Sequence, residues 1–138
     1  MITKILIPID GSKNSEKGLK YACWLAGKVD AEITVLHIVS IPYTGESIAF
    51  QIAPLEDAGR EILKHAEKLI EGNCANAKYV LREGVGNAGH EIVNYAKDNN
   101  FSIIVMSAKG HSALTHLFLG SVSETVSKNA PCSILIVK

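Results

Sequence analysis

Short apolar runs alternate along this chain with stretches whose apolar residues recur at helical spacing, and this alternation limits the possible folds most. The runs without helical periodicity are Ile5–Ile9, Ile33–Val39, Ala77–Leu81, Ile103–Met106 and Ile134–Val137. Most are rich in Ile and Val and almost continuous, which is typical of strands buried on both faces. Strands that alternate with helices predict a parallel sheet covered by those helices. We therefore expect an α/β fold with an open, five-stranded parallel sheet and helices on both faces.

Amphipathic stretches separate these runs, and their ends carry helix signals. The apolar stripes lie within Leu19–Ala26, Leu55–Ile70, Ile92–Ala96 and Val122–Ala130. Asn87 is suited to cap the third helix, and Ser121 with Glu124 forms a capping-box pattern for the fourth. Pro131 is expected to end that helix. The longest connection, Ser40–Ala53, contains proline and glycine and is a candidate mobile flap over one end of the sheet.

The balance of charge and apolar residues excludes several classes of protein. The chain has 138 residues, 14 basic and 14 acidic side chains, and 47% hydrophobic residues. A net charge of zero argues against a broad grip on nucleic acid or anionic lipid, and the apolar content argues against disorder. No apolar run approaches the ~20 residues that cross a bilayer. We expect one domain over residues 1–138, with no nucleic-acid or membrane partner.

Cysteine usage and the first residues favour the cytoplasm. Cys23, Cys74 and Cys132 are odd in number and have no CxxC spacing. They fit reduced thiols better than disulfides or a zinc site. The opening residues lead directly into the first apolar run without a signal-peptide pattern. We therefore expect a cytoplasmic protein.

Two loops are candidates for ligand binding, because ligands of open α/β sheets bind beyond the carboxyl ends of the strands. The first loop, Pro8–Ser12, places Asp10 between a strand and a helix. The Asp10 carboxylate there is able to accept hydrogen bonds from a ligand. Alternatively, Asp10 or Ser12 simply caps the helix while Gly11 makes the turn. Residue types alone leave both interpretations open.

The second candidate loop follows the fourth apolar run. It comprises Met106–Ser112, turns at Gly110, and leads on to Gly120, which opens the last helix. The start of a helix presents unpaired N–H groups and a partial positive charge, so this segment has the ingredients of an anion site. Lys109 and His111 make the neighbourhood mildly basic. An ordinary loop followed by a capped helix is the plainer alternative.

Other patterns give little support to catalysis. Gly84–Gly89 spells GxGxxG, the dinucleotide-binding pattern, but it follows the third strand and lacks the acidic residue expected ~20 positions later. We interpret it as a turn with Asn87 as a helix cap. The sequence has no Walker P-loop, no GxSxG elbow and no metal-binding spacing of histidines. His37, inside an apolar run, is interpreted as a core or sheet-edge histidine.

With these loops in view, the whole chain resembles the universal stress protein family. Lys4–Ser12 is similar to the family's first strand and turn, and Leu36–Val39 to its second strand. Gly86–Ile92 resembles the start of its third helix, with Ala88 where proline is usual. Ala130–Cys132 and the final strand also fit the family.

The most specific part of the resemblance is a glycine motif near the C-terminus. Family members that bind ATP carry G-x2-G-x9-G-[ST]. Gly110, the nine residues after it, and Gly120 with Ser121 match the later part of that motif. Ser107 stands where the motif has its first glycine.

The resemblance implies a Rossmann-like strand order of 3-2-1-4-5 and a ligand, ATP, bound with or without Mg²⁺. It implies an adenine pocket near Pro8, Ile9 and the Ile38 backbone, with Asp10 near the ribose. The full set of implied nucleotide-binding residues is Pro8, Ile9, Asp10, Ile38, Met106, Ser107, Gly110, Gly120, Ser121, Val122 and Ser123. The last strand, Ser133–Lys138, would be an exposed edge, and many family members form homodimers through it.

We therefore expect an ATP-binding stress-response or signalling module that holds its nucleotide without rapid turnover. One alternative is a nucleotide-free dimeric adaptor that acts through protein contacts, and Ser107 is the sequence feature that favours it. Another is a slow ATP hydrolase that uses Asp10 as its carboxylate. The sequence assigns no catalytic residue and no metal ligand, and it identifies no protein partner.

Overall fold

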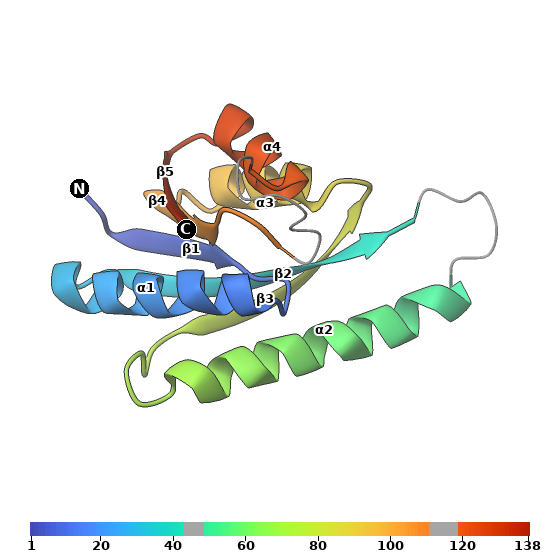
Figure 1. The fold of residues 1–138 in the computed structure, drawn as a ribbon, viewed down its shortest axis with the longest axis horizontal. Coiled ribbons are helices and arrows are strands. Elements are labelled where there is room, and N and C mark those ends of the chain that lie inside the picture. The colour runs from blue at the N-terminus through green and yellow to red at the C-terminus, as the bar shows by residue number, and fades with distance from the viewer. Residues whose placement is uncertain (43–48, 111–118) are drawn as a thin grey trace.

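The computed structural model describes residues 1–42, 49–110 and 119–138 (Figure 1). Its strands are β1 (Lys4–Pro8), β2 (Glu32–Ile41), β3 (Lys78–Val85), β4 (Ile103–Ser107) and β5 (Ser133–Val137). They form one parallel sheet in the order β3-β2-β1-β4-β5. The helices are α1 (Lys13–Val29), α2 (Ala49–Ile70), α3 (Ala88–Asp98) and α4 (Ser121–Asn129). The predicted fold class and strand order are confirmed.

The helices cover the two faces of the sheet in pairs. α1 and α2 lie on one face, and α3 and α4 lie on the other (Figure 1). Side chains along β1 alternate between the two layers: Ile5 and Ile7 pack under α1 and α2, and Leu6 packs under α3 and α4. All three are 0% exposed. A strand buried on both faces needs apolar residues at every position, which explains its continuous apolar sequence.

The strand boundaries differ from the prediction mainly at the edge strand β3. The sequence predicts a strand over Ala77–Leu81, but β3 continues to Val85 because its register with β2 extends to the pair of Ile41 and Val85. The added residues include Arg82 and Glu83, which are exposed. An edge strand tolerates such polar residues, so the apolar pattern ends before the strand does.

The predicted Ser40–Ala53 connection is shorter in the structure. Ser40 belongs to β2, and α2 begins at Ala49. The helix continues through Pro54, although proline removes one helical hydrogen bond. Residues 43–48, the centre of the predicted flap, lie outside the described residues.

Helix caps agree with the sequence at α3 but not at α4. The Asn87 side chain accepts a hydrogen bond from the Gly89 N–H at 2.7 Å, as predicted. The capping box of Ser121 and Glu124 is wrong: Gly120 is the N-cap residue of α4, and glycine has no side chain with which to cap that terminus. A capping box would make Ser121 the N-cap residue, but α4 begins one residue earlier, so Ser121 is the first residue of the helix. Glu124 instead pairs with Lys128 at 2.8 Å.

A glycine sets the distance between α2 and the sheet, and its substitution tests the packing. A Cβ at Gly59 would lie 2.7 Å from Leu81 Cδ1 and 3.0 Å from His37 Cδ2, whereas one at Gly27 in α1 would meet nothing within 4 Å. We expect Gly59→Ala to be about 1–3 kcal/mol less stable than Gly27→Ala, because overpacking offsets the gain in helix propensity. Urea unfolding measures both, and equal stabilities would contradict this packing.

Candidate nucleotide site

The described residues enclose a cavity of about 690 Å³ at the carboxyl ends of β1, β2 and β4. This end of the sheet is where the strand order reverses on either side of β1, the usual place for a ligand in an open α/β fold. Its volume is in the range of small-molecule sites. The structure brings every sequence-predicted site residue to this cavity: Pro8, Ile9, Asp10, Ile38, Met106, Ser107, Gly110, Gly120, Ser121, Val122 and Ser123.

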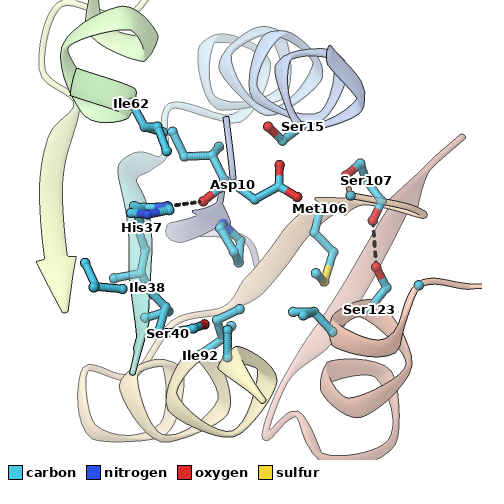
Figure 2. Close-up of a pocket in the computed structure, with 18 of the residues that line it drawn as sticks. Asp10, Ser15, His37, Ile38, Ser40, Ile62, Ile92, Met106, Ser107 and Ser123 are labelled. Carbon is cyan, nitrogen blue, oxygen red and sulfur yellow. Dashed lines mark hydrogen bonds between the residues drawn. The ribbon is translucent and has the colours of Figure 1, made fainter. Parts of the chain in front are cut away.

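The loop after β1 has both a structural role and a face toward the cavity. Ser12 is the N-cap of α1 and accepts a hydrogen bond from the Ser15 N–H at 3.1 Å, and Gly11 makes the turn with φ of 83°. Asp10 Oδ1 accepts a hydrogen bond from the Ser12 N–H at 2.9 Å. Asp10 Oδ2 lies against Gly110, where a Cβ would overlap it. The helix cap, Ser12, and the carboxylate that lines the cavity, that of Asp10 (Figure 2), are therefore different residues of one turn.

His37 fixes this loop to β2. Its Nδ1 lies 2.8 Å from the Ile9 carbonyl oxygen (Figure 2), and the Ile9 N–H donates to the Leu36 carbonyl at 2.8 Å. A carbonyl oxygen only accepts, so His37 Nδ1 carries a proton and donates it. The interpretation of His37 as a histidine with a satisfied hydrogen bond fits this geometry. The sequence did not indicate that His37 also lines the cavity.

Ser107, which replaces the motif glycine, fits its position in β4. Its hydroxyl donates to the Lys109 carbonyl at 2.9 Å, and its own carbonyl accepts from the Ser123 hydroxyl at 2.9 Å (Figure 2). Ser107 does not have a positive φ, so the backbone here does not require glycine. Because the Ser123 hydroxyl is used to join α4 to β4, Ser123 faces a ligand mainly through its backbone N–H.

The N-terminus of α4 is open toward the cavity. The first-turn N–H groups of a helix have no intrahelical acceptor, and the N-cap residue, Gly120, has no side chain to accept from them. Gly120 has φ of −64°, and a Cβ there would meet only ordinary contacts, the nearest 3.5 Å away. The backbone therefore does not require glycine at this position either, and its small size leaves space in front of the helix. Such a terminus carries partial positive charge and favours an anion.

Of the two basic residues that the sequence places near this loop, the structure describes Lys109. Lys109 lines the cavity. His111 and the rest of residues 111–118 lie outside the described residues. Within the described parts of the chain, no group of three or more His, Cys, Asp or Glu side chains is arranged to hold a metal ion. Asp10 is the one acidic side chain among the described residues that line the cavity.

Sequence reasoning missed the wall that α2 contributes. Leu55, Ala58, Gly59 and Ile62 line the cavity from this helix. Their helical spacing predicts a buried stripe, but it does not say that part of the stripe faces a cavity rather than the sheet. With these apolar walls and the α4 terminus, the cavity is suited to a ligand that joins an apolar group to an anion.

Comparison with known proteins identifies related sequences. The model of the universal stress protein family matches residues 1–138. Universal stress protein YxiE of Bacillus subtilis is 34% identical, with 100% of both chains covered. Universal stress protein MJ0531 of Methanocaldococcus jannaschii is 36% identical, with 98% of this chain and 81% of that protein covered.

Solved structures share the fold. Hypothetical protein MJ0577 has a TM-score of 0.86 at 28% identity, covering 100% of this chain and 96% of that one. A universal stress protein in complex with cAMP has a TM-score of 0.76 at 19% identity, covering 99% and 97%. A universal stress protein from Archaeoglobus fulgidus in complex with dAMP has a TM-score of 0.71 at 20% identity, covering 100% and 98%. At these identities the last two similarities concern the fold alone.

The hydrogen bond from Ser123 to the Ser107 carbonyl holds α4 against β4, and it can be tested directly. Ser123 is 3% exposed, so Ser123→Ala leaves a buried acceptor without this donor. We expect a loss of about 1–2 kcal/mol in the free energy of unfolding. Ser127→Ala, on the exposed side of the same helix, is the control and should change stability by less than about 0.5 kcal/mol. Equal effects in urea unfolding would contradict the role of Ser123.

Proposed function

The chain belongs to the universal stress protein family, and from this premise we propose that it is an ATP-binding stress-response or signalling module of the cytoplasm. The observation that carries the proposal is the convergence of the Pro8–Asp10 loop, Ile38 and the open α4 terminus on one cavity. Relatives of the same fold were solved with cAMP and dAMP, which supports an adenine nucleotide as the ligand class. Free cysteines fit a reducing compartment.

The two ends of the cavity suit the two ends of a nucleotide. Apolar side chains at the ends of β1 and β2, among them Pro8 and Ile38, suit the adenine ring, and Met106 lies at the end of β4. Asp10 would accept hydrogen bonds from the ribose. The triphosphate would lie along Gly110 and the N–H groups at the start of α4, where backbone donors favour negative charge. Mg²⁺, where present, would be held by phosphate oxygens together with Asp10.

We further propose that bound ATP is held rather than rapidly hydrolysed. Fast hydrolysis needs a group that positions and activates water, and the carboxylate offered by the described lining is that of Asp10. One of its oxygens is already bonded to the Ser12 N–H. A phosphate-release assay with saturating ATP would show slow or no turnover, and fast turnover would contradict this part of the proposal.

Isothermal titration calorimetry tests nucleotide binding, with Gly120→Asp as the informative variant. The cavity has room for this side chain, and Asp is a favourable helix N-cap, so the variant should fold with equal or higher stability. Its carboxylate would occupy the N–H groups at the start of α4 and repel phosphate. We expect saturable ATP binding by the parent and binding weaker by about tenfold or more in the variant.

Ser127→Asp is the matched control, because it adds the same charge to the same helix on its exposed side. It should bind ATP as the parent does. Equal binding by Gly120→Asp and the parent would place the phosphates elsewhere. A parent that binds no ATP at millimolar concentration would contradict the proposal and favour the nucleotide-free adaptor, the alternative that the serine at position 107 suggests.

We propose that the chain forms a homodimer through β5. This strand is the edge of the sheet, and Ile134–Val137 are half-buried and apolar although, among the strands that the structure describes, only β4 pairs with them. Such an edge is a template for a second strand. Light scattering after size-exclusion chromatography should give twice the chain mass of 14.8 kDa. A monomer mass at micromolar concentration would contradict dimerisation.

A further inference from the structure

The loop between β4 and α4 carries a lysine at the part of the cavity that suits an anion. Lys109 is half-buried and lines the cavity, and it is the one lysine or arginine among the described lining residues. Its Cα lies 3.5 Å from the position that a Cβ on Gly120, the N-cap residue of α4, would occupy. A lysine side chain has a long, flexible stem, so its ammonium is within reach of an anion at that terminus.

Hydrogen bonds hold the backbone around this lysine. The Ala108 N–H donates to the Val137 carbonyl of β5 at 3.0 Å, and the Ala108 carbonyl accepts from the Gly120 N–H at 2.8 Å. A further bond runs from the Ser107 hydroxyl to the Lys109 carbonyl at 2.9 Å. Ser107 belongs to β4 and is 9% exposed. The backbone of the lysine is therefore tied both to the sheet and to the start of α4.

The ammonium of Lys109 has no partner among the described residues. No ion pair and no side-chain hydrogen bond joins it to any of them. Lys128 of α4, by contrast, pairs with Glu124 at 2.8 Å. Attraction between charges is stronger near the protein interior than in water, so a half-buried cation gains from an anion placed beside it. The cavity thus offers a positive charge that a ligand phosphate would neutralise.

We propose that Lys109 binds the phosphate held at the start of α4, and that Ser107 is its positioning residue. This inference rests on the proposed nucleotide function and names the side chain that recognises the phosphates. The N–H groups of α4 supply hydrogen bonds and a partial charge, and Lys109 supplies a full positive charge. The Ser107 hydroxyl fixes the Lys109 peptide group and so restricts the directions that the lysine side chain takes.

Serine in place of the motif glycine then has a function of its own. Glycine has no hydroxyl with which to hold the Lys109 carbonyl, whereas Ser107 does so without a positive φ. The substitution is therefore compatible with binding, and it adds order to the loop that carries the lysine. Because Lys109 interacts with phosphate and not with the base or the sugar, its effect should depend on whether the ligand is phosphorylated.

Titrations with ATP and with adenosine test the role of the lysine. Lys109→Met removes the charge and keeps most of the apolar stem. We expect calorimetry to show ATP binding weaker by about tenfold or more, because a charge-assisted contact is lost. Adenosine, followed by amide chemical shifts that also report weak binding, should bind as it does to the parent. Lys20→Met is the matched control: Lys20 is exposed on α1 and does not line the cavity, so both affinities should stay unchanged.

A double-mutant cycle tests the role of Ser107. Ser107→Ala removes the hydroxyl and should weaken ATP binding by about threefold or more when Lys109 is present. In Lys109→Met the same substitution should leave the ATP affinity unchanged, because the charge that it positions is absent. A serine that only stabilises the loop would weaken binding equally in both backgrounds. Circular dichroism and urea unfolding establish that each variant is folded under the conditions of the titration.

Two results would overturn the role of Lys109. They are ATP binding by Lys109→Met equal to that of the parent, and an equal loss of affinity for ATP and adenosine in this variant. Either result leaves the proposed nucleotide function standing, since the parent still binds ATP. Equal effects of Ser107→Ala with and without the lysine would overturn the positioning role of Ser107. A parent that binds no ATP at millimolar concentration would contradict this inference and the proposed function together.

Discussion

Burial of β1 between β2 and β4 is the constraint on which the rest of the structure depends. Its central residues are 0% exposed, so both faces of the sheet must be covered by helices. The chain then continues to β2 on one side of β1 and returns to β4 on the other. Connections that leave a parallel sheet in opposite directions open a crevice at the carboxyl ends of the strands. The same burial that stabilises the fold therefore creates the cavity.

Short hydrogen bonds connect this core to the walls of the cavity. His37 ties the carbonyl of Ile9 to β2, and the next residue is Asp10. On the other side, Ser123 ties α4 to the end of β4. Each bond originates in a strand or helix rather than in a loop, so the loops are held at defined positions. A site built this way is arranged before a ligand arrives, which reduces the ordering cost of binding.

Periodicity was sufficient to predict the element order, the parallel sheet and two candidate loops after β1 and β4, whereas the individual residues of the cavity were implied by the resemblance to the family. Periodicity did not predict the ends of strands and helices where tertiary contacts determine them. The apolar pattern of β3 ends before Arg82 although pairing with β2 continues, and α2 begins before Pro54. The capping pattern at Ser121 was wrong by one residue because Gly120 bonds back to Ala108 and sets the start of α4. The bond from His37 to Ile9 has no local sequence signal, since the two residues are on different segments.

The proposed nucleotide site is tested most directly by an amide chemical-shift titration with ATP, since it reports where the ligand lies as well as whether it binds. Backbone donors at the start of α4 are expected to hold the phosphates, and the Pro8–Asp10 loop the adenosine. The account predicts saturable shifts that are largest at the N–H groups of Ser121, Val122 and Ser123, with a second group at Asp10 and Ile38. Shifts that do not saturate at millimolar ATP, or that are largest on the outer face of α1, would contradict it.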